Sequence, residues 1–189
     1  MKKLRITFNS PVILSFVIIS LAVMLISEIT RGEATALLFT TWHSSLSSPL
    51  TYLRLFTHVL GHGSWQHYVG NMAYILLLGP MLEEKYGSRK ILGVMLITAL
   101  MTGLVNYIFF WNIALCGASG IVFAFILLTS FTSFKEGENP LTFILVFVIY
   151  IGQQIFEGVV RSDNISNLSH IIGGLVGAVV GYLFNRKAK

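Results

Sequence analysis

The sequence predicts an all-α membrane protein in which six transmembrane helices form a single domain over residues 1–189. Of the 189 residues, 54% are hydrophobic and only 11% are charged, and the mean hydropathy is +0.76. A soluble domain has roughly a quarter of its residues charged, so this composition excludes an ordinary soluble protein. Six apolar segments each approach the ~17–25 residues that a helix needs to cross a bilayer. They cover residues 11–29, 67–82, 89–110, 118–134, 140–158 and 169–185.

The first apolar segment, residues 11–29, follows a basic start of the chain. A cleaved signal peptide is one alternative, because Ala34-Thr35-Ala36 has the small-residue pattern of a cleavage site. Three charged residues separate that pattern from the apolar core of this segment: Glu28, Arg31 and Glu33. This separation favours a first span that stays in the protein.

Residues 30–66 are too mixed in polarity to form a span. They include a serine-rich stretch and the aromatic residues Trp42, Tyr52 and Trp65. Trp and Tyr are enriched where a membrane meets water. We therefore expect a long interfacial loop between the first and second spans, with room for short helices.

The basic residues predict the orientation of the chain in a cell membrane. Cytoplasmic loops of membrane proteins carry an excess of Lys and Arg. With both termini in the cytoplasm, the outer side holds only Arg31, Arg54 and Arg161, and all other Lys and Arg residues of the chain lie inside. This arrangement puts the long loop and the 111–117 loop on the outer side.

A motif of small residues, Cys116-Gly117-Ala118-Ser119-Gly120, interrupts an apolar run that is too long for one span. Within a membrane, irregular backbone is tolerated where it is buried in protein or lines a water-filled cavity. We therefore expect Ser119 to begin a helix at a wet pocket. The alternative is that Gly117, Ala118 and Gly120 only allow two helices to pack closely.

The last apolar segment carries His170, and Gly173 and Gly177 follow on the same helix face. Such a glycine face permits close helix packing, and the small residues around Ser119 suit it as a partner. If the two faces meet, His170 lies beside Ser119 and can act as the general base for a serine nucleophile. The alternative is that His170 only bonds a loop carbonyl near the membrane surface.

A carboxylate that would complete a catalytic triad is hard to find. The only aspartate, Asp163, falls in a loop, and Glu157 is the only acid near the fifth segment. We therefore predict that His170 is oriented by packing and that the catalytic unit is a dyad, a variant of the triad.

The second span opens with His67 and Asn71, four residues apart on one helix face. Polar groups at the start of an apolar helix are costly unless they are used. They can donate hydrogen bonds to an oxyanion together with the Ser119 backbone N–H. The alternative is that they tie the long loop to the helix bundle.

His58 and His62 have the spacing of metal ligands on a helix, but no Glu follows His58 as in a metalloprotease motif. We predict hydrogen-bonding roles for both and expect no metal, no cofactor and no nucleic-acid partner. Cys116 is a rival nucleophile, but it precedes the expected helix start, so Ser119 is better placed.

Taken together, these motifs resemble the rhomboid family of intramembrane serine proteases. The resemblance extends from about Arg54 to Gly181 and includes the order and spacing of the motifs. Along the chain they are His58-x3-His62-x4-His67-x3-Asn71, Glu83-x3-Gly87, Gly117-Ala118-Ser119-Gly120 and His170-x2-Gly173-x3-Gly177. Gly-x-Ser-Gly alone is a weak signal, but the ordered set is specific.

The resemblance implies a rhomboid-like six-helix bundle with a Ser–His dyad that opens to the outer side. It also implies cleavage of single-span transmembrane proteins near the membrane surface. In this interpretation Ser119 and His170 are catalytic, and Ser119, His67 and Asn71 form the oxyanion site. The supporting residues are Gly117, Gly120, Phe123, Gly173 and Gly177.

The chain departs from the family pattern at two positions. Many members have Trp-Arg in the first loop, where this chain has Leu53-Arg54. Many have Tyr four residues after the serine, where this chain has Phe123. A phenylalanine ring can still stack under His170, but it offers no hydroxyl group. Because neither change removes a proposed catalytic group, we expect an active enzyme.

Two other functions are compatible with parts of the sequence. One is a catalytically silent rhomboid-like protein that binds membrane helices, which the presence of both Ser119 and His170 disfavours. The other is a small transporter with a polar site in the membrane. The break at residues 111–120 fits a transporter, but the first half of the chain has no matching break. The sequence does not predict the oligomeric state.

Overall fold

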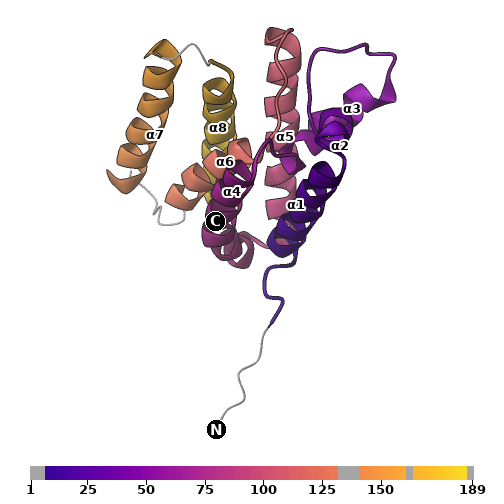
Figure 1. Cartoon of the computed structure of the whole chain (residues 1–189). Helices are drawn as coiled ribbons and strands as arrows, with labels where there is room; N and C mark the ends of the chain where they lie inside the picture. Colours follow the sequence, from indigo (N-terminus) through magenta and orange to yellow (C-terminus); the bar gives the residue numbers. More distant parts are fainter. Residues whose placement is uncertain (1–6, 132–140, 161–163, 187–189) are drawn as a thin grey trace.

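The computed structural model describes residues 7–131, 141–160 and 164–186, and these residues are mainly helical (Figure 1). The predicted all-α class is confirmed. In this part of the chain, the isolated pairing of Thr41 with Leu115 is the only β-type bridge. The helices are α1 Pro11–Ile29, α2 Glu33–Leu38, α3 Pro49–Thr57, the 3-10 helix η1 His58–Leu60, α4 Trp65–Tyr86, α5 Ser88–Phe109, α6 Ser119–Ser130, α7 Leu141–Val160 and α8 Asn164–Arg186.

Helix α6 lies at the centre of the bundle. It packs most extensively on α8 and also contacts α4, α5 and α7, while α7 lies at the edge beside α8 and α6 (Figure 1). Ile121, Ala124, Phe125, Leu127 and Leu128 of α6 are all fully buried. A helix that is apolar on all sides belongs in the interior of a bundle, and this explains the central position of α6.

Each of the six apolar segments coincides with a helix, but their lengths differ from the expectation. Among the described residues, the helices long and apolar enough to cross a membrane are α1, α5 and residues 167–185 of α8. Helix α6 has 12 residues and ends at Ser130. At 1.5 Å per residue it is about 18 Å long, shorter than a ~30 Å hydrocarbon core. The six-span count therefore stays a prediction. Residues 132–140, which include the end of one expected span and the start of the next, lie outside the described residues.

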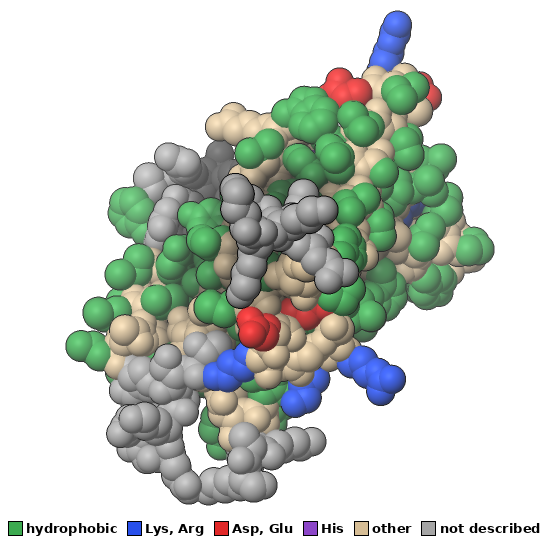
Figure 2. Space-filling model, turned by 90° about the horizontal axis from the view of Figure 1, so that it is seen from below, with side chains coloured by type: hydrophobic (Ala, Val, Ile, Leu, Met, Phe, Trp, Pro, Cys, Tyr) green, Lys and Arg blue, Asp and Glu red, His purple; other side chains and the backbone are tan. Residues whose placement is uncertain are grey.

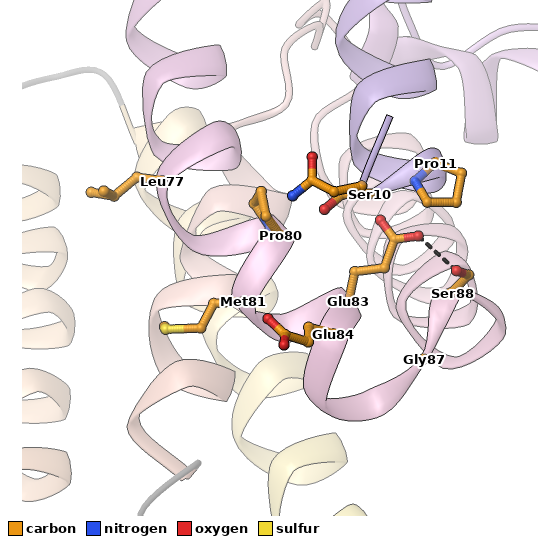
Figure 3. A pocket seen from close by; sticks show the side chains of 10 residues that line it. Ser10, Pro11, Leu77, Pro80, Met81, Glu83, Glu84, Gly87 and Ser88 are labelled. Atoms are coloured by element: carbon orange, nitrogen blue, oxygen red, sulfur yellow. Dashed lines mark hydrogen bonds between the residues drawn. The ribbon is translucent and has the colours of Figure 1, made fainter. Parts of the chain in front are cut away.

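The buried carboxylate of Glu83 joins the end of α4 to the start of α1 (Figure 3). Its two oxygens accept hydrogen bonds from the backbone N–H groups of Val12 and Ile13, each at 3.1 Å. The Ser88 hydroxyl donates to the same carboxylate at 2.7 Å. A negative charge at a helix N-terminus is stabilised by the unpaired N–H groups and by the helix dipole. These bonds give the glutamate of the Glu83-x3-Gly87 motif a structural role. The glycine of the motif, Gly87, turns the chain after α4 with a φ of +85°.

Basic side chains collect at this same end of the bundle. The turn from α4 to α5 carries Lys85, Arg89 and Lys90, and Figure 2 shows basic side chains beside an acidic patch on this face. The Lys90 ammonium lies 4.9 Å from the centre of the Phe184 ring, which joins α5 to α8. The start of α1 and the end of α8 lie at this end as well (Figure 1).

At the opposite end, the long loop is fastened to the segment that leads into α6. Thr41 and Leu115 exchange two backbone hydrogen bonds, of 2.9 and 2.8 Å. The buried Asn106 side chain of α5 donates to the carbonyls of Thr41 and Ile113, at 3.2 and 3.1 Å. These bonds hold residues 113–117 in place, and the first turn of α6 follows directly.

Candidate active site

Ser119 is the first residue of α6, as the sequence predicts. Gly117 precedes it with a φ of +127°, a conformation that favours glycine. The Gly117 N–H donates to the carbonyl of His58 at 2.9 Å. A Cβ atom at Gly117 would lie 2.5 Å from Cε1 of His67, so a side chain here would collide with the imidazole. Gly117 therefore allows both the turn and the approach of α4 to the start of α6.

The glycines of α8 face α6, and this is the contact expected from the sequence. A Cβ atom at Gly173 would overlap the carbonyl oxygen of Gly120, and one at Gly177 would overlap that of Ala124. Backbone packs against backbone at both positions, so no flexible side chain is there to move aside. The two helices approach each other as closely as their backbones allow.

His170 lies one turn before this contact and stacks on Phe123. The two ring centres are 4.4 Å apart and the rings are nearly parallel, at 8°. Tyr150 of α7 packs edge-on against Phe123, with the two ring centres 5.7 Å apart. The ring at position 123 therefore supports the imidazole by its face, although it has no hydroxyl group.

The four residues assigned to catalysis and the oxyanion site line one cavity. Ser119, His170, His67 and Asn71 all border a space of about 390 Å³. It is further lined by Gln66, Gly70, Tyr74, Leu115, Cys116, Val122 and Phe123. Sequence reasoning missed Gln66, Gly70 and Tyr74, although their four-residue spacing places them on one face of α4. The same spacing relative to His67 and Asn71 could have indicated that these three residues lie near the cavity.

Asn71 borders this cavity and carries a buried side-chain donor that is not used by the described residues. The residue is 7% exposed, and its Nδ2 atom has no hydrogen-bond partner among the described residues. An unpaired buried donor is costly, and such atoms are rare in native proteins. The Nδ2 atom lies 3.7 Å from the position of a Cβ at Gly117, close to the start of α6. A ligand oxygen at this point would satisfy it.

His67 is held by the first turn of α4. Ser64 caps this helix, because its hydroxyl oxygen accepts from the His67 backbone N–H at 3.2 Å. The imidazole extends toward Gly117, with Nε2 only 2.8 Å from where a Cβ would stand. The helix cap thus fixes the position from which His67 borders the cavity.

His58 and His62 lie deep in the protein and bond backbone carbonyls. The Nδ1 atom of His58 lies 3.1 Å from the Arg54 carbonyl, and that of His62 lies 3.2 Å from the Leu60 carbonyl. Burial lowers the pKa of each imidazole to about 4, and His67 contributes to the effect at His62. Both rings are therefore neutral near pH 7. No three potential metal ligands among His, Cys, Asp and Glu come together in the described ranges.

Of the remaining candidates, only Cys116 can be placed relative to the cavity. Asp163 falls outside the described residues, and the side chain of Glu157 does as well. Cys116 lines the cavity, but burial raises the pKa of its thiol. Since the thiolate is the reactive form, this environment makes Cys116 a poor nucleophile near neutral pH.

The comparison with protein families gives a match that spans most of the chain. Residues 49–187 match the model of the Rhomboid domain. This range contains the serine motif at Ser119, the polar residues His67 and Asn71 of α4, and the glycine stripe of α8, which is formed by Gly173 and Gly177. Rhomboid proteins are typically intramembrane serine proteases that act on transmembrane substrates in the bilayer, and the family also has inactive members. The chain belongs to the rhomboid family.

Proposed function

We propose that this protein is an intramembrane serine endopeptidase that uses Ser119 and His170 as a catalytic dyad. The observation that carries the proposal is the shared cavity: Ser119 and His170 border it together with Asn71, whose buried Nδ2 donor has no partner among the described residues. A nucleophile, a base and an oxyanion donor around one space are the parts that acyl transfer requires.

The proposed reaction proceeds in two acyl-transfer steps. His170 takes the proton of the Ser119 hydroxyl as its oxygen attacks the scissile carbonyl, and His170 then protonates the leaving amine. Water, activated by the same imidazole, releases the acyl group from Ser119. With no carboxylate in the proposed catalytic unit, the stacked ring of Phe123 orients His170.

The oxyanion is stabilised by the Ser119 backbone N–H, His67 and Asn71. The Ser119 N–H belongs to the first turn of α6, where backbone donors are unpaired and the helix dipole favours negative charge. Nδ2 of Asn71 supplies a side-chain donor that has no partner in the described residues. These donors are in place before the charge develops, which is the condition for a large electrostatic effect.

Replacing Asn71 by alanine should lower kcat by about 10²–10³-fold with a smaller effect on KM, because one oxyanion donor is typically worth that much. Steady-state kinetics with a purified transmembrane substrate measure both constants. Asn71→Asp serves as the size-matched control, since it keeps the shape and replaces the donor by an acceptor. A change in thermal stability alone, with normal kcat, would instead assign Asn71 to holding the fold.

For the arrangement in the cell membrane, we propose a single domain over residues 1–189 with six spans and both termini in the cytoplasm. The cavity then opens toward the outer side, and single-span transmembrane proteins are cleaved near that surface. Basic residues support this orientation, because those of the α4–α5 turn lie at the end of the bundle opposite the Thr41–Leu115 bridge.

The orientation predicts which positions react with an impermeant thiol reagent outside intact cells. In a Cys116→Ala background, cysteines at Ser45 or Asp163 should be labelled, whereas cysteines at Ser88 or Lys187 should react only after the membrane is opened. The reverse labelling pattern would refute an outward-facing cavity.

A serine-directed fluorophosphonate probe tests the proposed activity without knowledge of the natural substrate. We expect labelling at Ser119, found by mass spectrometry, and its loss in His170→Ala. A silent rhomboid protein or a transporter predicts no labelling in the folded wild-type protein. The presence of Ser119 and His170 on the same cavity favours the protease over both alternatives.

A further inference from the structure

A second cavity lies at the basic end of the bundle and shares no lining residue with the candidate active site. Its volume is about 630 Å³, and it lies between the start of α1, the end of α4 and the α4–α5 turn (Figure 3). Leu77, Pro80 and Met81 line it from one face of α4, because residues three and four apart share a helix face. Leu77 and Met81 are also exposed. The cavity is therefore continuous with an apolar surface of the bundle.

Glu84 lines the cavity from the same face of α4, three residues after Met81. The residue is exposed, and no hydrogen bond or ion pair joins its carboxylate to another described residue. The second acid of the cavity, Glu83, already accepts bonds from two backbone N–H groups of α1 and from Ser88. Among the described residues, no Lys or Arg lines this space. The cavity therefore offers an unpaired negative charge, which suits a cation.

Ser10 brings a buried hydroxyl group without a partner to the same cavity. The residue is 2% exposed and precedes α1 at the N-cap position, but its side chain makes no capping bond. Glu83 takes the N–H groups that such a cap would use. The Ser10 oxygen is not among the enclosed atoms that lack a partner, so it is reached from the cavity, and in Figure 3 the side chain points toward Pro80. A ligand atom here would satisfy a hydroxyl that is costly to leave unpaired.

We propose that this cavity binds the ethanolamine headgroup of a phospholipid in the leaflet at the basic end of the bundle. The primary ammonium group pairs with the Glu84 carboxylate through a charge-assisted hydrogen bond, and the Ser10 hydroxyl bonds a further headgroup atom. Basic side chains stand beside the acidic patch on this face (Figure 2), and the exposed Arg89, next to Ser88 of the cavity, meets the lipid phosphate. The bound lipid connects the start of α1 to the end of α4.

Native mass spectrometry of the full chain in detergent tests the binding. The protein is offered equal amounts of phosphatidylethanolamine, phosphatidylcholine and phosphatidylglycerol with the same acyl chains. We expect phosphatidylethanolamine to be retained in preference, because the other two lipids have no cationic N–H donor. Glu84→Gln should lower its retention about fivefold, which is the upper range for an exposed ion pair, and leave the other two lipids unchanged. Glu28→Gln, at an exposed glutamate near the opposite end of α1, is the matched control and should behave like wild type.

Thermal unfolding supplies a second measurement. Phosphatidylethanolamine, but not phosphatidylcholine, should raise the thermal midpoint of wild type, and Glu84→Gln should lose this rise while keeping the midpoint of the lipid-free protein. Equal retention of the three lipids, or full retention by Glu84→Gln, would overturn the proposal. Displacement of the lipid by millimolar ethanolamine alone would assign the site to a free amine and refute the lipid. Binding that appears only after Lys2, Lys3 and Arg5 are replaced by glutamine would assign Glu84 to the basic start of this chain instead.

Discussion

Replacing Ser119 by alanine should abolish cleavage of transmembrane substrates while the protein still folds. Loss of the nucleophile in a serine protease lowers kcat by a factor on the order of 10⁶. The fold should persist because the Ser119 side chain borders a cavity and does not fill the packed core. The start of α6 depends instead on Gly117 and its bond to the His58 carbonyl.

Cleavage assays in lipid vesicles with purified wild type and Ser119→Ala measure this effect, and thermal unfolding checks the fold. Cys116→Ala is the matched control, because it removes the other potential nucleophile that lines the cavity. We expect it to keep most of the activity. Turnover at the wild-type rate by Ser119→Ala, or loss of activity only in Cys116→Ala, would contradict the assigned nucleophile.

Replacing Gly177 by leucine should nearly abolish cleavage and also lower the thermal stability. Even a Cβ atom at this position would overlap the carbonyl oxygen of Ala124. Since backbone cannot move aside as a flexible side chain can, α8 must shift away from α6. His170 lies two turns earlier on α8, and a displacement of about 1 Å at a catalytic group can cost ~10²-fold in rate. Overpacking of this kind destabilises by about 1–3 kcal/mol.

Ala178→Leu is the control for added bulk, because position 178 points about 100° around the helix from Gly177. We expect a smaller loss of both activity and stability. Initial cleavage rates and thermal midpoints are compared for the two variants and wild type. Equal behaviour of the two variants would mean that close contact with α6 does not govern the position of His170.

Patterns local in the sequence predicted the helices and most of the candidate site. The length of an apolar segment reports a span, and a repeat of three or four residues reports a helix face. By these rules the range of α1, the start of α6 at Ser119 and the glycine stripe of α8 could be predicted. They also placed Ser119 and His170 on facing helices, because a glycine stripe requires a close partner.

Only the tertiary structure decided the features that join distant parts of the chain. The early end of α6 at Ser130, the bridge from Thr41 to Leu115 and the stack of Trp42 on Arg54 have no periodic signal. The same holds for the bonds of Glu83 to the N-terminus of α1. A local pattern reports which face of a helix is apolar or small, since that depends on the helix alone. A buried charge or an unpaired donor finds its partner wherever the fold brings one, and that partner depends on the packing of the whole bundle.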